Sequence, residues 1–299
     1  MTHTNPAPTE QYLDSEDGGP RLFTRHWRPA NDAAPKAAPR AAIVICHGVN
    51  SHGGQYLWAG EQFAAAGYAV TALDLRGRGR SDGERYYIDS IDEYVADVGR
   101  AIALAKSRDP GLPVYLLGHS AGGVTSVTYA LDHQDEIAGL ICESFAFRVF
   151  APDFALKLLE GASHVLPHAH VLKLKNEDFS RDPAWVAALN ADEYTQGETQ
   201  PVATVAAFAR AGERFEREFG RITLPVLILH GTADKATRPD GSQQFFDAAG
   251  SSDKTLKLYE GHYHDLLNDV GREAVMADIL GWIGERVGQE VGLAMPATA

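Results

Sequence analysis

The sequence predicts an α/β fold with a mostly parallel sheet of about eight strands flanked by helices, and three observations predict it. Short apolar segments alternate with longer segments of helical periodicity over most of the 299 residues. The short segments are almost continuously apolar, as are strands that are covered on both faces of a parallel sheet. The chain is 44% hydrophobic and 22% charged, which is enough apolar surface for a large core.

The elements can be assigned in order from the N-terminus. Residues 11–13 and 21–27 are typical of two short strands of a hairpin, joined through Asp17, Gly18 and Gly19. A flexible connection rich in Ala and Pro is expected at 29–40. Beyond it, strands and helices alternate, with strands predicted at 41–46, 69–73, 114–117 and 137–142 and helices at 56–66, 91–107 and 121–133.

The alternation stops between residues 144 and 219. This stretch contains helical fragments at 153–159 and 202–215 but no convincing strand. We interpret it as an insertion that divides one core domain into residues 1–143 and 220–299. The core pattern resumes with strands at 225–229 and 255–259 and helices at 241–249 and 273–287, and the last ten residues, 290–299, should be loose.

Charge and composition exclude several classes of protein. The chain has 27 basic and 40 acidic residues and a formal net charge of −13, which repels phosphate backbones and anionic membrane surfaces. We therefore expect no nucleic-acid partner. Residues 1–11 lack the basic start and apolar stretch of a secretory signal, and there is no run of about 18 apolar residues that could span a bilayer. These features predict a cytoplasmic protein without stable membrane insertion.

A G-x-S-x-G pentapeptide at 118–122 is the strongest candidate for chemistry. It directly follows the strand 114–117 and precedes the helix at 121, which is the strand-turn-helix setting of a nucleophile elbow. The glycines two residues before and after Ser120 approach each other too closely for a Cβ. The turn exposes the Ser120 hydroxyl beside a helix N-terminus, which favours a developing oxyanion. A plain N-cap serine is the alternative, but it leaves both glycines unexplained.

A serine hydroxyl needs a base and an orienting carboxylate, and the chain has candidates for both downstream. Asp234 follows the strand 224–229, and His262 and His264 share the loop after the strand 255–259. Spacing does not choose between these two histidines. Glu143, at the end of another strand, and Asp240 are rival acids, although Asp240 is better placed to cap the next helix.

Several motifs together resemble the monoacylglycerol lipase and lysophospholipase branch of the α/β-hydrolase superfamily, from about residue 12 to 287. They are His47-Gly48-Val49, Asp74 to Ser81, Gly118 to Gly123, His230 to Asp234 and Tyr263-His264. The resemblance implies that Ser120 is the nucleophile, Asp234 the acid and His264 the base. It also implies that Val49 and Ala121 stand where the oxyanion donors lie, and that residues 144–219 form a helical cap that lines an acyl pocket.

The chain departs from that branch on the substrate side. Val49, Asn50 and Ser51 follow His47-Gly48, where the family commonly has a small pair and an acidic residue. Leu75 and Arg78 stand where the family commonly has His. The expected activity is hydrolysis of carboxylic esters, either monoacylglycerol-like or with other small to medium acyl groups. Amide or peptide cleavage on the same triad, hydrolysis of aromatic monoesters, and a non-catalytic binding protein are the alternatives.

No metal or organic cofactor is expected, and the only partner predicted is a small ester substrate. His164, His168 and His170 are separated by Pro167 and lack an accompanying carboxylate or thiolate. Three arginines on the Gly-rich loop could bind a phosphate, but such residues usually pair with acids nearby. We expect Arg76, Arg78 and Arg80 to pair with acids such as Asp74, Asp82 and Glu84.

Overall fold

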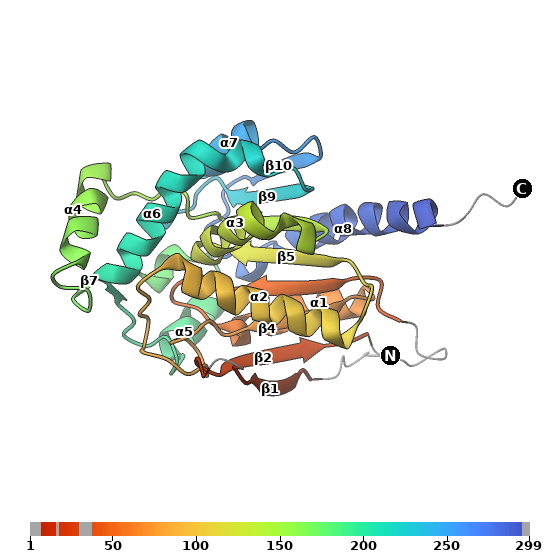
Figure 1. The fold of residues 1–299 in the computed structure, drawn as a ribbon, viewed down its shortest axis with the longest axis horizontal. Coiled ribbons are helices and arrows are strands. Elements are labelled where there is room, and N and C mark those ends of the chain that lie inside the picture. Colours follow the sequence, from red (N-terminus) through yellow and green to blue (C-terminus); the bar gives the residue numbers. More distant parts are fainter. Residues whose placement is uncertain (1–6, 16–17, 30–37, 295–299) are drawn as a thin grey trace, which may run out of the picture.

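The computed structural model describes residues 7–15, 18–29 and 38–294 and contains one eight-stranded sheet in the order β1-β2-β4-β3-β5-β6-β9-β10 (Figure 1). Within this sheet only the β1–β2 and β2–β4 pairs are antiparallel. The predicted α/β fold and its mostly parallel sheet are therefore confirmed. The strands are β1 (Thr9–Leu13), β2 (Leu22–Trp27), β3 (Ala42–Cys46), β4 (Ala69–Leu73), β5 (Val114–His119), β6 (Gly139–Glu143), β9 (Val226–Gly231) and β10 (Lys254–Tyr259).

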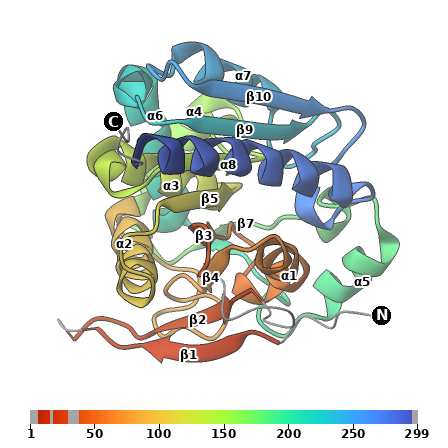
Figure 2. The same cartoon turned by 90° about the vertical axis from the view of Figure 1, so that its right-hand side faces the viewer.

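Helices cover both faces of the sheet, and the alternation of side chains along each strand divides the core in two. Val44 and Cys46 of β3 belong to one buried cluster, whereas Ile43 and Ile45 belong to the other. Figure 2 shows α1 and α2 on opposite sides of β3 and β4. The helices around the sheet are α1 (Leu57–Ala65), α2 (Ile91–Arg108), α3 (Ala121–His133), α7 (Pro239–Ala248) and α8 (Arg272–Ala294).

The segment between β6 and β9 lies at the end of the molecule toward which β5 points (Figure 1). It contains α4 (Asp153–Ser163), α5 (Pro183–Ala191) and α6 (Val202–Glu218), with α4 packed on α6. It also contains a small antiparallel pair, β7 (His170–Leu172) and β8 (Gln200–Pro201), so the expectation of no strand here is wrong. Strands of three and two residues are too short for an alternating pattern to be recognised.

Helix α2 shows why the element boundaries could be anticipated. Ser90 and Glu93 form a capping box at its N-terminus, and Tyr94, Val98 and Ile102 lie on its buried face. Three expectations fall partly or wholly outside the described residues: Asp17 in the hairpin turn, most of the connection at 29–40, and the last five of residues 290–299. Residues 290–294 belong to α8, so the expectation of a loose end is wrong there. None of the helices that the structure describes combines the length and the hydropathy needed to cross a bilayer.

The parallel arrangement decides where loop residues meet. Strands β5, β6, β9 and β10 are parallel neighbours, so the loops that follow them emerge at one edge of the sheet. Candidate side chains far apart in the sequence are thereby brought to one place.

Candidate active site

Ser120 lies at the turn between β5 and α3 in a conformation that few residues with a Cβ adopt. Its φ is 55° and its ψ is −120°, which costs on the order of 1–3 kcal/mol. Its amide donates to the Glu143 carbonyl at 2.8 Å, and its carbonyl accepts from Gly123. Its side chain makes no capping bond to α3. In the described part of the chain no hydrogen bond engages the hydroxyl, so the geometry does not favour a simple N-cap.

Gly118 and Gly122 flank Ser120, and a Cβ at each would collide with different neighbouring atoms. A Cβ on Gly118 would lie 2.6 Å from the Gly122 carbonyl oxygen, as the motif predicts. A Cβ on Gly122 would instead collide with the carbonyl oxygens of Cys46 and His47 at the end of β3. Gly122 therefore lets α3 begin directly against the neighbouring strand.

Val49 and Ala121 come together beside the serine. A Cβ on Gly48 would lie 2.9 Å from the Ser120 Cβ and 3.3 Å from the Ala121 nitrogen, so the two loops are in close contact. Val49, Ser120 and Ala121 all line one cavity. Among the described residues neither the Val49 nor the Ala121 amide has a hydrogen-bond partner. The free N–H of Ala121 at the start of α3 and that of Val49 on the loop after β3 suit an oxyanion.

Asp234 is buried and accepts hydrogen bonds at both oxygens. Oδ1 accepts from the amides of Ala236 (2.7 Å) and Thr237 (2.9 Å). Oδ2 lies 2.7 Å from His264 Nδ1, 2.8 Å from Thr237 Oγ1 and 3.1 Å from His230 Nε2. Burial by itself raises the pKa of the Asp234 carboxyl, but His264 and His230 outweigh it and hold that pKa well below its ordinary range.

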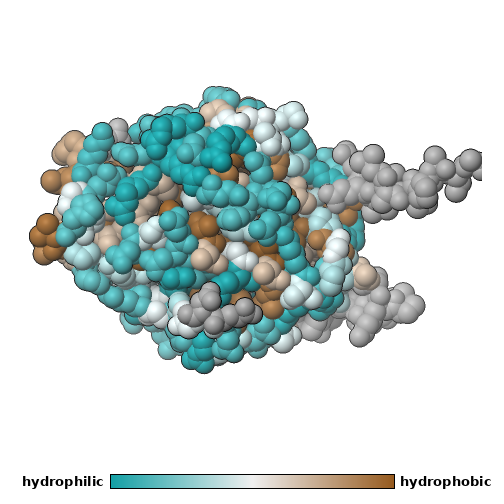
Figure 3. Space-filling view, in the orientation of Figure 1, coloured by the Kyte–Doolittle hydropathy of each residue, from teal (hydrophilic) through white to brown (hydrophobic). Residues whose placement is uncertain are grey.

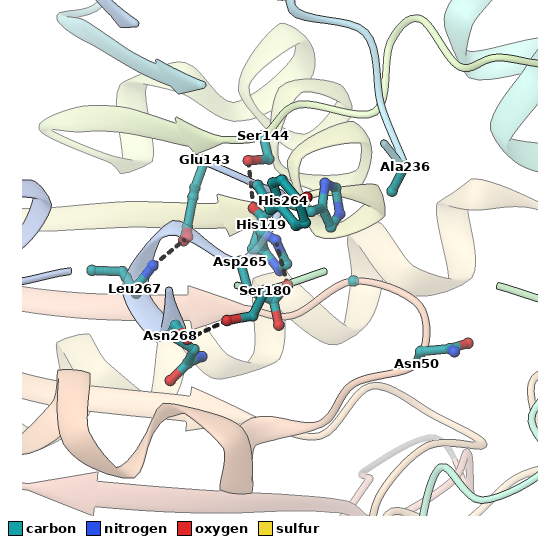
Figure 4. Close-up of polar contacts among 12 residues, drawn as sticks. Asn50, His119, Glu143, Ser144, Ser180, Ala236, His264, Asp265, Leu267 and Asn268 are labelled. Carbon is teal, nitrogen blue, oxygen red and sulfur yellow. Dashed lines mark hydrogen bonds and ion pairs between the residues drawn. The ribbon is translucent and has the colours of Figure 1, made fainter. Parts of the chain in front are cut away.

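His264 is 1% exposed and faces Asp234 through Nδ1. Because an ionised carboxylate can only accept, Nδ1 carries the proton of this bond, and Nε2 is left to act as a base. Burial lowers the pKa of His264, but the charge and hydrogen bond of Asp234 reverse the effect and raise it overall. The Ser144 hydroxyl fixes the backbone by donating to the His264 carbonyl at 2.6 Å (Figure 4).

The rival residues lie elsewhere. Nδ1 of His262 contacts the Glu260 carbonyl at 3.2 Å, and Asp240 pairs with Arg238 inside the first turn of α7 rather than capping it. Glu143 accepts from the Leu267 amide at 3.0 Å (Figure 4), and its Oε2 is buried without a partner. Glu143 therefore forms no hydrogen bond with His264.

Two further buried acids, Asp265 and Glu143, raise the pKa of the His264 imidazole through their charge when they are ionised. Burial raises the pKa of Glu143 to about 8 and that of Asp265 to about 6. Burial likewise lowers the pKa of His119 to about 3. Figure 4 shows His119 and Asp265 beside His264. At neutral pH the Glu143 carboxyl and the His119 imidazole are therefore largely uncharged.

The structure also identifies residues that sequence analysis missed. Thr237, His230 and Ser144 each contact Asp234 or His264, as described above. The spacing of Asp234 and Thr237, with side chain to backbone bonds two and three residues on, is that of an Asx turn and could have identified Thr237. No sequence pattern indicated Ser144, because its bond to the His264 carbonyl joins residues 120 positions apart.

The cavity beside Ser120 has a volume of about 590 Å³ and is mainly apolar. Its lining includes Phe147, Leu174, Phe179, Val205 and Phe208, all from the segment between β6 and β9. Exposed apolar side chains also gather over α4 and the turn after it, at the end of the molecule where Figure 3 shows hydrophobic surface. They include Phe154, Leu158, Val165 and Leu166.

One group could hold a metal ion. His119, His264 and Asp265 offer donor atoms within 4.8 Å of one another, the single group of this kind in the described residues. An ion there would compete with a role of His264 as a base. His168 instead pairs with Glu84 at 2.8 Å and His170 contacts Thr199 at 2.6 Å.

Comparison with known proteins places the chain in one family. Residues 37–271 match the family model described as serine aminopeptidase, S33 (Hydrolase_4). A monoacylglycerol lipase of Mycolicibacterium smegmatis is 33% identical over 89% of this chain and 94% of its own length. Caffeoylshikimate esterase of Arabidopsis thaliana is 31% identical over 93% of this chain and 86% of its own. The crystal structure of a monoacylglycerol lipase of Paleococcus ferrophilus superimposes with a TM-score of 0.78 at 28% identity, covering 89% of this chain and 99% of that one.

Proposed function

Because this chain belongs to the serine aminopeptidase S33 family, in its monoacylglycerol lipase-like branch, we propose that it hydrolyses carboxylic esters through Ser120, His264 and Asp234. The branch is the one that the motifs predict. The single observation that carries the proposal is the buried Asp234–His264 pair, 2.7 Å apart, at the same sheet edge as the strained Ser120 turn.

In the first half of the reaction, His264 Nε2 takes the proton of the Ser120 hydroxyl as Oγ attacks the ester carbonyl carbon. The carbonyl oxygen becomes an oxyanion, which the Val49 and Ala121 amides stabilise. Collapse of the tetrahedral intermediate breaks the bond to the alkoxy oxygen. The imidazolium returns its proton to that oxygen, and the alcohol leaves an acyl-Ser120 ester.

The second half repeats these steps with water. His264 takes a proton from a water molecule, and the hydroxide formed attacks the acyl carbonyl. The intermediate then collapses, Ser120 Oγ takes the proton back, and the carboxylic acid leaves. Asp234 stays ionised throughout and stabilises the imidazolium, as its low pKa requires.

We assign residues 144–219 as the cap of this site. Most of the apolar residues that line the cavity come from this segment, and the cavity reaches Ser120. A volume of about 590 Å³ lies within the usual range for small-molecule sites. The cavity therefore suits an apolar acyl chain, and monoacylglycerol-like esters are our first candidate substrates.

Aromatic monoesters are the second candidate substrate class. A relative of 31% identity is named caffeoylshikimate esterase, and the residues after His47-Gly48 differ from those common in the family. Phe147, Phe179 and Phe208 in the cavity could pack against an aromatic acid. Amide cleavage on the same triad is suggested only by the name of the family model.

A substrate panel tests the proposal and separates these classes. The purified chain is assayed with nitrophenyl esters from acetate to decanoate, a monoacylglycerol, a lysophospholipid, an aromatic monoester and a matched anilide. We expect ester turnover with kcat/KM rising toward the longer acyl chains. Preference for acetate would contradict the acyl-chain assignment, preference for the aromatic ester would select the second candidate, and faster cleavage of the anilide would contradict ester specificity.

A further inference from the structure

Arg78 forms a buried ion pair with an acid that its own loop does not contain. Its Nη1 lies 2.5 Å from Oε1 of Glu198, and both side chains are 1% exposed. Its other nitrogens donate to Tyr94 and Gln200, each at 2.8 Å. The expectation that Arg78 pairs with a neighbouring acid is therefore wrong, because its carboxylate comes from the segment between β6 and β9.

Glu198 uses the same oxygen to hold the main chain beside the candidate oxyanion site. Oε1 accepts from the Asn50 amide at 2.9 Å, whereas Oε2 is buried without a partner. Asn50 directly follows Val49 and has a φ of 51°, which is uncommon for a residue with a Cβ. Asparagine adopts this region more readily than most residues, and the bond to Glu198 holds the loop in it further.

The Val49 amide is thus fixed from both sides. On one side Gly48 packs against Ser120 so closely that a Cβ would lie 2.9 Å from the Ser120 Cβ. On the other side the Asn50 amide is bonded to Glu198. An oxyanion donor must be held within a few tenths of an ångström to be effective.

A carboxylate close to an oxyanion would oppose the charge that forms there, and Arg78 removes this conflict. Burial lowers the pKa of Arg78, but Tyr94 and Glu198 raise it above the ordinary arginine value. Arg78 therefore stays charged and neutralises Glu198 in place. The pair can hold the Asn50 amide without adding net negative charge next to the site.

We propose that Glu198 is a positioning residue for ester hydrolysis: it holds the Val49 amide in the oxyanion site through Asn50, so that residues 144–219 contribute to the chemical step as well as to the cavity. The inference rests on the proposed function. It gives Oε1 of Glu198 a second role, the hydrogen bond to the Asn50 amide, in addition to its ion pair with Arg78.

Two substitutions separate the hydrogen bond from the charge. Glu198→Ala removes the acceptor, whereas Glu198→Gln keeps an acceptor oxygen on a side chain of the same length. Neither variant supplies a negative charge to neutralise Arg78. We expect Glu198→Ala to lower kcat for a nitrophenyl ester on the order of tenfold to hundredfold with KM within about twofold. Glu198→Gln should recover most of this loss. The affinity for a trifluoromethyl ketone, which binds as an oxyanion, should change in parallel with kcat. It should fall in Glu198→Ala and largely recover in Glu198→Gln.

Asn176→Ala is the matched control. It removes the contact to the Asn50 side chain, 3.3 Å from Asn176 Oδ1, and leaves the Asn50 amide bonded. It should leave kcat and ketone affinity at wild-type values. If Glu198→Ala fails to fold, Glu198→Asp is tested in its place. The Asp side chain keeps the negative charge for Arg78 but is shorter by one methylene, so its oxygens lie farther from the Asn50 amide. This variant should lose more activity than Glu198→Gln.

Equal losses in Glu198→Ala and Glu198→Gln would overturn the inference, because charge balance alone would then explain the role of Glu198. Wild-type kcat in Glu198→Ala would overturn it as well. A wild-type protein that neither turns over esters nor binds the ketone would instead overturn the proposed function, so the two failures are distinguishable.

Discussion

Asp234 Oδ2 and His264 Nδ1 lie 2.7 Å apart, although the two residues are separated by 30 positions and follow different strands. The parallel register of β9 and β10 brings their loops together, and burial isolates the pair from water. Such a contact fixes one tautomer and one orientation of the imidazole.

Replacing the acid should therefore damage catalysis while preserving the fold. We expect Asp234→Asn to lower kcat by about ten-thousandfold, because an amide can donate to Nδ1 and select the wrong tautomer. Asp240→Asn is the control, since Asp240 pairs with Arg238 near the surface. Esterase kinetics of both variants test the assignment, and an Asp234→Asn enzyme with near wild-type kcat would move the acid to another residue.

The pH profile should report the raised pKa of His264. Catalysis needs the neutral imidazole, so kcat/KM should fall as the pH drops through that pKa, which lies above the ordinary 6.5. Asp234→Asn removes the carboxylate that raises it and leaves the burial that lowers it. The acid limb of the residual activity should therefore move to lower pH. An unmoved limb would mean that another group controls the profile.

Glu143 should affect stability rather than catalysis. Its pKa rises from 4.5 to about 8 on folding, so between these pH values the native state binds more protons than the unfolded state. Stability from this group is therefore present below pH 4.5 and lost as the pH rises toward 8. Glu143→Gln should show a higher Tm than wild type at pH 9 and a smaller difference at pH 5.

The same variant tests Glu143 as the rival acid. The amide of Glu143→Gln keeps an oxygen that can accept from the Leu267 amide, so the loop that carries His264 should be preserved. We expect kcat within about threefold of wild type, because Glu143 forms no hydrogen bond with the imidazole and is largely uncharged at neutral pH. A loss as large as that of Asp234→Asn would assign the acid to Glu143 instead.

The close approach of α3 to β3 should make Gly122 intolerant of any side chain. A Cβ there collides with the carbonyl oxygens of Cys46 and His47, so Gly122→Ala should lower the free energy of unfolding by at least about 3 kcal/mol. Gly281 in α8 has open space around it, and Gly281→Ala should raise stability by about 0.5–1 kcal/mol. Chemical denaturation measures both, and a Gly122→Ala protein of wild-type stability would contradict the packing argument.

Local signals in the sequence were enough to predict most of the fold. The predicted helix at 121–133 and strand at 69–73 match α3 and β4 at both ends. Their starts are marked by local signals, the turn at Ser120 before α3 and Gly67 before β4. The strands β7 and β8 were missed because residues 170–172 are exposed on both faces and carry no alternating burial. Their pairing depends on the tertiary packing of the inserted segment.

The residue types of the candidate site could be predicted from the sequence, but residue spacing left open which histidine belongs to it. The motif and its glycines single out Ser120, and strand ends place acids and histidines on the same side of the sheet. Spacing did not distinguish His264 from His262, and only the family resemblance favoured His264. In the structure His264 lies against Asp234, whereas His262 contacts the Glu260 carbonyl. Glu198 gave no signal at all, because its contact with Asn50 spans 148 positions.

The central claim is that His264 activates the Ser120 hydroxyl, and covalent labelling tests it most directly. The wild-type chain, His264→Gln and His262→Gln are treated with a fluorophosphonate, and the adduct is located and timed by mass spectrometry. The account predicts a single adduct on Ser120 that forms at similar rates in wild type and His262→Gln, and at least about a hundredfold more slowly in His264→Gln. An adduct on another residue, or equally fast labelling of His264→Gln, would contradict it.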